Sequence, residues 1–127
     1  MAGRPKNLLF IWTDEQRPDT IGAYGNPRIR TPTLDRLGAQ SILFEQAYCT
    51  QPVCSPSRAT VVTGVYPHTH GLLRNNMLLT TTIPTLAELL RPVGYVCGYV
   101  GKWHLGNEVR PQRGFEQFWV STEDTYT

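Results

Sequence analysis

The sequence has few cysteines, little net charge and no long apolar run, and each shortage excludes a class of protein. Three cysteines among 127 residues are too few for a fold held together by disulfides. A net charge of +2, spread along the chain, gives no basic surface for nucleic acid or a membrane. No apolar segment is long enough to cross a bilayer. The remaining composition, with 40% hydrophobic residues, is typical of one globular domain with its own core.

The amino end looks like a secretory signal only at first sight. Basic residues precede the apolar run Leu8 to Trp12, but Asp14 follows where a small-residue cleavage site belongs. A short, continuous apolar run instead predicts a buried strand of a parallel sheet over Asn7 to Thr13. We therefore expect a cytoplasmic protein, unless an extension precedes Met1, and the free cysteines suit that reducing compartment.

Capping and turn residues predict three helices. A threonine–proline pair is typical of a helix start and predicts a helix over 31–40. Residues 57–63 are rich in β-branched side chains and suit either a helix or a strand, but Pro56 in a first turn and Gly64 as a stop favour the helix. Apolar residues at helical spacing predict the third helix over 83–90.

Two further segments, residues 42–49 and 94–106, have the apolar patterns of strands. Strands that alternate with short helices predict an α/β fold, with a largely parallel sheet flanked by helices. No linker or low-complexity segment divides the chain. The final residues 120–127 are polar and show neither helix nor strand pattern.

Five polar residues fall at the carboxyl ends of the predicted strands. Asp14 and Glu15 end the first strand, Cys54 follows the second, and Lys102 and His104 follow the last. In open α/β sheets, ligands bind outside the carboxyl ends of the strands. These side chains are therefore expected to converge on one ligand site.

The charges of these residues indicate what the ligand would be. Cys54 and Arg58 are four apart and would share one face at the start of the predicted helix, where backbone N–H groups and the helix dipole suit an anion. Lys102 adds a cationic donor. The adjacent carboxylates Asp14 and Glu15 would be costly in such a cleft unless a hard cation lay between them and the anion. The residues therefore predict a divalent metal with an oxyanion substrate.

Other polar residues have plainer explanations. Cys49 and Cys97 are expected as small, buried hydrophobic residues. His68 and His70 have the spacing of metal ligands, but no third ligand is in view, so local hydrogen bonding is the better interpretation. Trp103 is expected to point into the core, on the opposite side of an extended segment from Lys102 and His104.

Four stretches of the sequence together resemble one family. "IWTDEQRPD" lies upstream of "CSPSR", "ATVVTGVYPHTHG" follows directly, and "GYVGKWHLG" lies downstream. They are similar to the amino-terminal part of the type I sulfatases, in the alkaline-phosphatase-like superfamily, and the match runs from about Asn7 to Phe118. The C-x-P-S-R signature with a G-K-W-H-L-G segment at this separation is highly specific.

The resemblance implies a nucleophile that is made after translation. Cys54 would be oxidised to formylglycine by a maturation enzyme, and the hydrated aldehyde would attack sulfur while held by a divalent metal, usually Ca²⁺ in this family. Asp14 would be a metal ligand together with residue 54. Glu15 stands where members often have a second aspartate or a glutamine, and is the remaining metal candidate.

The same residue-by-residue match implies further roles. Arg58 would stabilise the formylglycine oxygen, Lys102 would bridge the substrate sulfate and the nucleophile, and His104 would hydrogen-bond the nucleophile's second oxygen. Asn75 would contact the substrate. The substrate would be a small-molecule or carbohydrate sulfate ester, with aryl, choline and carbohydrate sulfates all open, and no nucleic-acid or membrane partner is expected.

Three interpretations of the whole chain remain open. Family members are much longer, so residues 1–127 are expected to be the amino-terminal part of a single catalytic domain, with an incomplete metal site and no activity in isolation. A phosphonate or phosphate ester hydrolase of the same superfamily is the enzyme alternative, although Lys102 with His104 favours a sulfatase. The third interpretation is a catalytically inactive fragment that binds an anion or a partner.

Overall fold

The computed structural model describes residues 6–107 and 110–119, so the pattern expected over 120–127 lies outside the described residues. Residue contacts divide the chain into two compact units, Met1–Ala47 and Tyr48–Thr127. Among the described residues, no helix has both the length and the apolar character of a membrane span.

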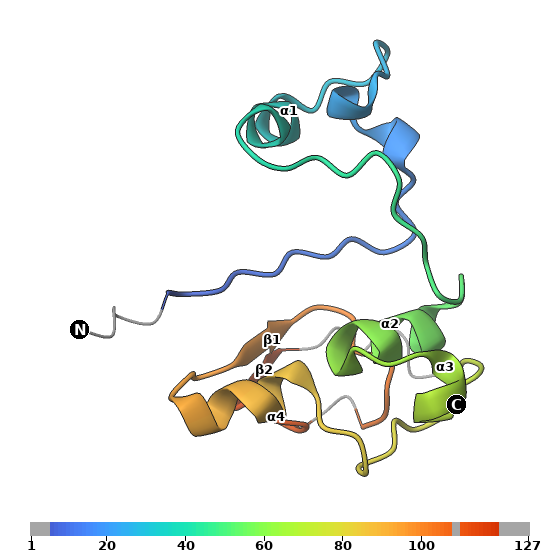
Figure 1. Cartoon of the computed structure of the whole chain (residues 1–127), viewed down its shortest axis with the longest axis vertical. Coiled ribbons are helices and arrows are strands. Elements are labelled where there is room, and N and C mark those ends of the chain that lie inside the picture. Colours follow the sequence, from blue (N-terminus) through green and yellow to red (C-terminus); the bar gives the residue numbers. More distant parts are fainter. Residues whose placement is uncertain (1–5, 108–109, 120–127) are drawn as a thin grey trace. The chain divides into compact units, whose positions relative to one another are not determined.

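The first unit contains three short helical elements (Figure 1): η1 (Pro18–Thr20), η2 (Gly22–Tyr24) and α1 (Pro32–Ala39). The helix predicted over 31–40 is confirmed, with a proline in its first turn. Thr31 precedes it, and its hydroxyl donates to the Asp35 carboxylate (2.8 Å) and accepts from the Gly22 N–H (2.8 Å). Gly22 permits this approach because a Cβ there would lie 2.8 Å from an Asp35 carboxylate oxygen. These bonds join α1 to η2.

The strands predicted over 7–13 and 42–49 are wrong for this structure. Both segments lack regular secondary structure, and their apolar side chains, apart from half-buried Trp12, are exposed, with Leu9 and Ile42 each 82% exposed. Within the described residues of this unit, neither segment pairs with a neighbouring strand. A strand forms only where another chain segment completes its ladder of hydrogen bonds, so the apolar pattern alone does not create one.

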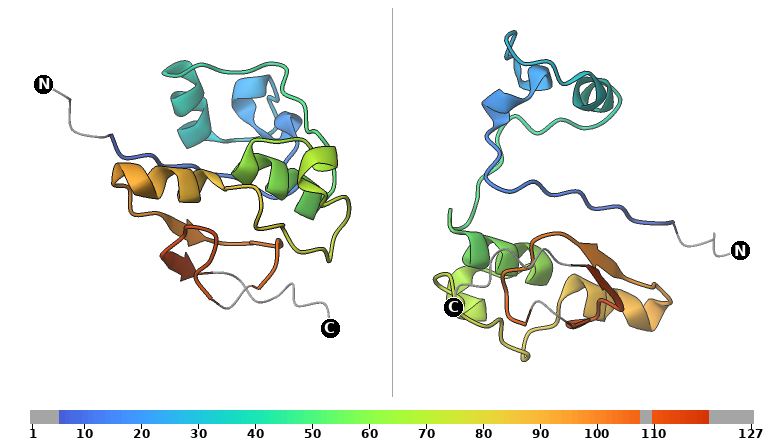
Figure 2. Two further views of the ribbon diagram at one scale, coloured as in Figure 1. Left: turned by 60° about the horizontal axis from the view of Figure 1, so that its bottom comes forward. Right: turned by 180° about the vertical axis from the view of Figure 1, so that it is seen from behind.

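The second unit contains helices, a 3-10 turn and a small sheet (Figures 1 and 2): α2 (Cys54–Thr63), α3 (Pro67–His70), α4 (Leu86–Leu90), η3 (Arg91–Val93), β1 (Gly98–Val100) and β2 (Gln117–Trp119). The strands pair in parallel, with Tyr99 opposite Phe118. This confirms a parallel sheet with helices. However, the strand predicted over 94–106 is reduced to β1, which is largely exposed, and β2 was not predicted.

Helix α2 begins earlier than predicted. Val53 is extended (φ −133°, ψ 141°) and Cys54 is the first helical residue, three positions before the predicted start at Ser57. The helix ends at Gly64, whose φ of 73° is left-handed and whose N–H donates to the Thr60 carbonyl (2.7 Å). The helical interpretation and the glycine stop are therefore confirmed.

Helix α4 begins with a capping box. The Thr85 hydroxyl accepts from the Glu88 N–H (3.2 Å), and the Glu88 carboxylate accepts from the Thr85 N–H (2.8 Å). Arg113 donates to Glu88 (3.0 Å), which lowers the pKa of that carboxyl, and also to two carbonyls of the preceding loop. These bonds fix Thr85 in an extended conformation, so the helix starts at Leu86 and not at residue 83.

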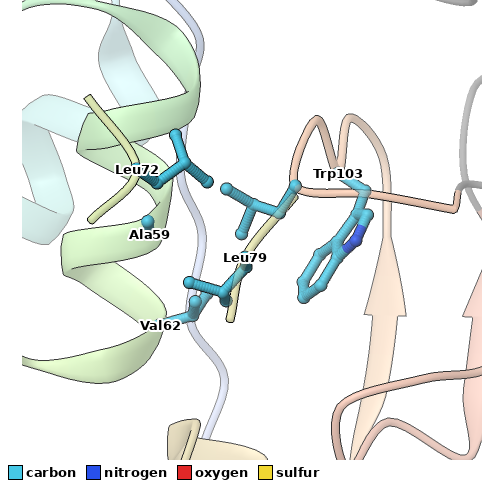
Figure 3. Packing of buried hydrophobic residues seen from close by; sticks show 6 residues of the cluster. Ala59, Val62, Leu72, Leu79 and Trp103 are labelled. Atoms are coloured by element: carbon cyan, nitrogen blue, oxygen red, sulfur yellow. The ribbon is translucent and has the colours of Figure 1, made fainter. Parts of the chain in front are cut away.

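The core of the second unit joins helix α2 to the segment after β1. Figure 3 shows the buried side chains of this cluster, which are Ala59, Val62, Leu72, Leu79, Trp103 and Leu105. Trp103 is fully buried, as predicted, and its ring meets those of Tyr99, Phe115 and Phe118 at centroid distances of 5.0, 5.7 and 5.5 Å. Burial of this large aromatic group anchors the loop on both sides of it to the helix.

The three cysteines are free thiols, but they are not all buried. Cys49 is exposed, against the prediction, and its thiol contacts the Gln51 carbonyl (3.0 Å) and the Ser57 hydroxyl (3.3 Å). Cys97 is half-buried. Cys49 is accessible because the strand predicted over 42–49, which would have buried it, does not form.

Candidate active site

The candidate nucleophile lies at the start of a helix. Cys54 is half-buried and is the first residue of α2, where the first N–H groups have no partner within the helix and the dipole is positive. The helix begins here because extended Val53 leads into a buried turn formed by Ser55 and Pro56. The predicted location of Cys54 at a helix amino end is therefore confirmed.

Lys102 approaches this residue from a distant part of the sequence. Its Nζ lies 3.9 Å from the Cys54 Sγ. Lys102 follows β1 by two positions, and burial of the adjacent Trp103 holds the segment against the core. The predicted convergence of Lys102 with Cys54 is thus found within the second unit. The result is an ammonium group beside the nucleophile position.

Arg58 lies one helical turn after Cys54 and is buried, with 5% of its surface exposed. Its Nη1 donates to the Lys102 carbonyl (2.6 Å) and to the Tyr99 hydroxyl (3.4 Å). The guanidinium therefore connects the helix that carries Cys54 to the backbone of the segment that carries Lys102. The structure shows this hydrogen bond to the Lys102 carbonyl, whereas the predicted contact of Arg58 with a formylglycine oxygen stays a prediction.

His104 is buried and turns the chain sharply. Its φ is 57°, a left-handed value that costs a non-glycine residue about 1 kcal/mol. The segment around Lys102 and His104 is therefore not a continuous extended strand, which corrects the prediction. Trp103 is buried in the core, while its neighbour Lys102 lies beside Cys54. The expected role of His104 at the nucleophile's second oxygen stays a prediction.

Asn75 contacts the start of α2 directly. Its Oδ1 accepts a hydrogen bond from the Ser55 N–H (3.0 Å). Asn75 thus supplies to the helix start an acceptor of the kind that an N-cap side chain usually provides, while Val53 at the N-cap has none. The expected substrate contact of Asn75 stays a prediction.

The two candidate metal ligands lie in the first unit. Asp14 and Glu15 are consecutive and exposed, and Glu15 has a left-handed φ of 52°. Their carboxylate oxygens are the donors that a hard cation prefers. The sulfur of Cys54 is a soft ligand that suits such a cation poorly, whereas an oxygen at position 54 would suit it. The donor chemistry therefore fits a hard divalent ion only if residue 54 is oxidised.

His70 makes the local hydrogen bonds that were predicted for the His68 and His70 pair, whereas exposed His68 stacks on Tyr66. His70 is buried, its Nδ1 accepts from the Leu72 N–H (3.1 Å), and its Nε2 lies 3.2 Å from the Thr60 hydroxyl. Burial lowers the pKa of His70 and outweighs a hydrogen bond with the Pro56 backbone, which raises it; nearby His68 lowers it further. Because Nδ1 accepts a hydrogen bond, the ring is held in its neutral form with the proton on Nε2.

Known proteins resemble this chain over most of its length. The sulfatase family profile matches residues 6–127. Human N-acetylgalactosamine-6-sulfatase is 38% identical over 138 aligned positions, which cover 94% of this chain and 26% of the relative. The ulvan-active sulfatase of Formosa agariphila is 36% identical and is covered to 24%. The chain thus spans about a quarter of the length of the curated relatives that it matches.

Solved structures show the same fold. BT4656, solved with its substrate D-glucosamine-2-N,6-O-disulfate, is 34% identical, with a TM-score of 0.70 over 77% of this chain and 19% of that chain. The phosphonate monoester hydrolase of Agrobacterium radiobacter is 27% identical, with a TM-score of 0.76 over 87% of this chain and 25% of that chain. The fold is therefore that of the alkaline-phosphatase-like enzymes. Together with the match over residues 6–127, these findings show that the chain belongs to the sulfatase family.

Proposed function

We propose that this protein hydrolyses sulfuric esters with a formylglycine nucleophile made from Cys54. The observation that carries the proposal is the 3.9 Å approach of the Lys102 Nζ to the Cys54 Sγ at the first residue of α2. A cation and the N–H groups of a helix start together favour a sulfate group beside the nucleophile. In this proposal the chain supplies the nucleophile side of one catalytic domain, and further metal ligands lie outside residues 1–127.

In the second unit, some side chains would bind the sulfate group and others would hold the binding groups in position. The Lys102 ammonium would donate to sulfate oxygens and offset their charge as the ester bond breaks. Arg58 would hold the Lys102 backbone and keep its own positive charge near residue 54. His104, matched to the family motif, would hydrogen-bond the second oxygen of the nucleophile and exchange a proton with it.

A divalent metal and the modified residue complete the proposed chemistry, and the family implies both in general. Asp14 and Glu15 would hold the ion with residue 54, and their oxygen donors favour Ca²⁺. When present, the hydrated aldehyde supplies two hydroxyl groups on one carbon, one to attack sulfur and one whose deprotonation releases sulfate and restores the aldehyde. Conversion of Cys54 would require a formylglycine-generating enzyme as a partner.

A sulfated carbohydrate is the substrate class that we propose. One relative is named for N-acetylgalactosamine-6-sulfate chemistry, a second for activity on ulvan, and one solved neighbour holds a disulfated glucosamine. Which sugar and which position are sulfated would depend on residues beyond the shared site.

The enzyme alternative is a phosphonate or phosphate ester hydrolase. The observation in its favour is the Agrobacterium radiobacter phosphonate monoester hydrolase, which covers 87% of this chain. The pair Lys102 and His104 favours the sulfatase, because relatives that cleave phosphonate monoesters tend to replace that pair with uncharged residues. A sulfate monoester and a phosphonate monoester carry the same single negative charge, but phosphorus bears a carbon substituent where sulfur bears an oxygen, so one site can discriminate between them by shape.

A paired assay tests the proposal. The protein, in the longest form that its gene encodes, is expressed with a formylglycine-generating enzyme and given an aryl sulfate, a sulfated hexosamine and an aryl phosphonate monoester. We expect faster turnover of the sulfate esters, and no turnover by the Cys54→Ala variant. Faster phosphonate cleavage would favour the alternative enzyme. No turnover of any ester by the matured protein would favour a catalytically inactive chain.

A further inference from the structure

Two side chains from different segments meet at one backbone oxygen beside the nucleophile position. The Lys102 carbonyl accepts from Arg58 Nη1 (2.6 Å) and also from the Tyr99 hydroxyl. The same Nη1 donates to the Tyr99 oxygen (3.4 Å). The Tyr99 hydroxyl thus donates to the Lys102 carbonyl and accepts from the Arg58 guanidinium. The three groups form a closed triangle that joins α2, β1 and the Lys102 segment.

The ring of Tyr99 is held rigidly by other aromatic rings. It meets Trp103 edge-on at a centroid distance of 5.0 Å and Phe115 at 5.3 Å, and it stacks on Phe118 at 5.7 Å. Phe118 is also its register partner across the sheet. A ring packed in this way has little rotational freedom, so its hydroxyl occupies a defined point. Tyr99 can therefore fix the position of the groups that it bonds.

The triangle determines where the Lys102 ammonium can reach. Lys102 has a flexible four-carbon stem, so the position of its Nζ depends on how firmly its backbone is held. The carbonyl of that backbone is fixed by Arg58 and Tyr99, and Nζ lies 3.9 Å from the Cys54 Sγ. Arg58 is itself on the helix that begins at Cys54. Tyr99 is therefore linked to both sides of the nucleophile–lysine contact.

We propose that Tyr99 is a positioning residue for the nucleophile site. Its hydroxyl orients the Arg58 guanidinium and the Lys102 backbone together, and so keeps the ammonium beside residue 54. The importance of this role for catalysis rests on the proposed function, but the position of the Lys102 ammonium beside Cys54 can be measured without enzymatic turnover. The aromatic packing of Tyr99 is a separate, structural contribution that a phenylalanine would retain.

The test compares Tyr99→Phe with Tyr66→Phe in the unmatured cysteine form of the full chain. Tyr66 is a suitable control because it is 62% exposed, its ring stacks on His68, and its hydroxyl is not one of the three groups of the triangle. Cys54 is alkylated with iodoacetate and with iodoacetamide, and the modified Cys54 peptide is quantified by mass spectrometry. The anionic reagent is favoured by a nearby cation, so the ratio of the two rates reports the ammonium beside the sulfur.

We expect Tyr99→Phe to lower this ratio about fivefold, the effect of losing one hydrogen bond of ordinary strength. Tyr66→Phe should leave it unchanged, and Lys102→Met marks its lower limit. In the matured protein, Tyr99→Phe should reduce kcat for a sulfate ester more than it changes KM. A ratio and a kcat equal to those of the parent protein, alongside a lowered ratio in Lys102→Met, would overturn the proposal.

Separate controls distinguish a loss of folding from a loss of the positioning contact. The melting transition of Tyr99→Phe is compared with that of the parent, and if it is lost, O-methyltyrosine at position 99 replaces the variant. That side chain keeps the ring and the oxygen but cannot donate to the Lys102 carbonyl. A lowered alkylation ratio with no sulfatase activity in the matured parent would refute the proposed function and leave the positioning role intact.

Discussion

At the scale of single residues, Arg58 combines a charge with a structural contact. Its guanidinium is buried and bonds the Lys102 carbonyl, so a residue expected to act on the nucleophile also holds the neighbouring segment. The sequence spacing of Cys54 and Arg58 predicted their shared helix face. It could not predict the contact with Lys102, because that contact depends on how two segments 44 residues apart pack together.

The variant Arg58→Lys should be destabilised although it keeps the charge. Both contacts come from one guanidinium nitrogen, Nη1. A lysine side chain is one atom shorter and ends in a more strongly hydrated ammonium, so it would lose these contacts and be costlier to bury. We expect the free energy of unfolding, measured with urea, to fall by about 1–3 kcal/mol. Arg74→Lys, at an exposed position, is the matched control and should change little. Equal stability of both variants would show that the Arg58 contacts do not matter.

His70 should make stability depend on pH. Burial lowers its pKa below the ordinary value of 6.5, so on acidification the unfolded chain takes up the proton first. Because the unfolded state then binds more protons, the free energy of unfolding should decrease as pH falls below about 6.5, and level off below the lowered pKa of the folded chain.

Urea unfolding of the parent, His70→Gln and the exposed control His68→Gln from pH 8 to pH 5 checks this. His70→Gln should flatten the curve in that window, while His68→Gln should keep most of the dependence. If the free energy of unfolding of His70→Gln depends on pH as that of the parent does, a group other than His70 causes the dependence.

At the scale of elements, the start of α1 and the stop of α2 were predicted correctly, whereas the starts of α2 and α4 and two of the strands were not. The stop of α2 at Gly64 and the start of α1 depend on residues within one turn, so local sequence contains the information. The Thr-x-x-Glu signature at Thr85 also marks the start of α4, and it could have corrected the predicted start at residue 83. Strands need partners distant in sequence, which explains the errors over 7–13 and 42–49.

Asn75 shows how one element is completed by another. Its side chain accepts from the Ser55 N–H at the start of α2, a role with no local sequence signal because the two residues are 20 apart. Tyr99 escaped prediction for the same reason, since its partners come from α2 and from the loop after β1.

Two substitutions at Asn75 should separate its structural role from its expected substrate contact. Asn75→Ala should lower the free energy of unfolding by about 1 kcal/mol, and Asn75→Asp should restore it because a carboxylate accepts from the helix N–H and suits the dipole. In the matured protein, Asn75→Asp should nevertheless raise KM for a sulfate ester, since it places a negative charge near a site that binds the sulfate anion. An Asn75→Asp protein that is as unstable as Asn75→Ala would contradict the capping role.

At the scale of the whole molecule, the chain has a buried core in its second unit and exposed apolar segments in its first. The exposed side chains include Leu8, Leu9, Phe10, Ile11, Ile42 and Phe44. Exposed apolar side chains in such number promote association. The composition could not reveal this, because 40% hydrophobic residues suit a folded core equally well.

The 127-residue chain should therefore self-associate. Sedimentation velocity at rising protein concentration should show species larger than the monomer, and replacing Leu9 and Ile11 by lysine should shift the distribution toward the monomer. Leu78→Lys is the control for added charge, because Leu78 is also an exposed apolar residue but lies in the second unit. A monodisperse monomer at every concentration, with cooperative unfolding, would contradict this expectation.

The central claim is that residue 54 becomes the nucleophile. The most direct measurement is the mass of the peptide that contains Cys54, from protein expressed with a formylglycine-generating enzyme. The account predicts a peptide that has lost sulfur and two hydrogens and gained one oxygen, the change from thiol to aldehyde. An unmodified Cys54 peptide under conditions in which another sulfatase is fully converted would contradict it.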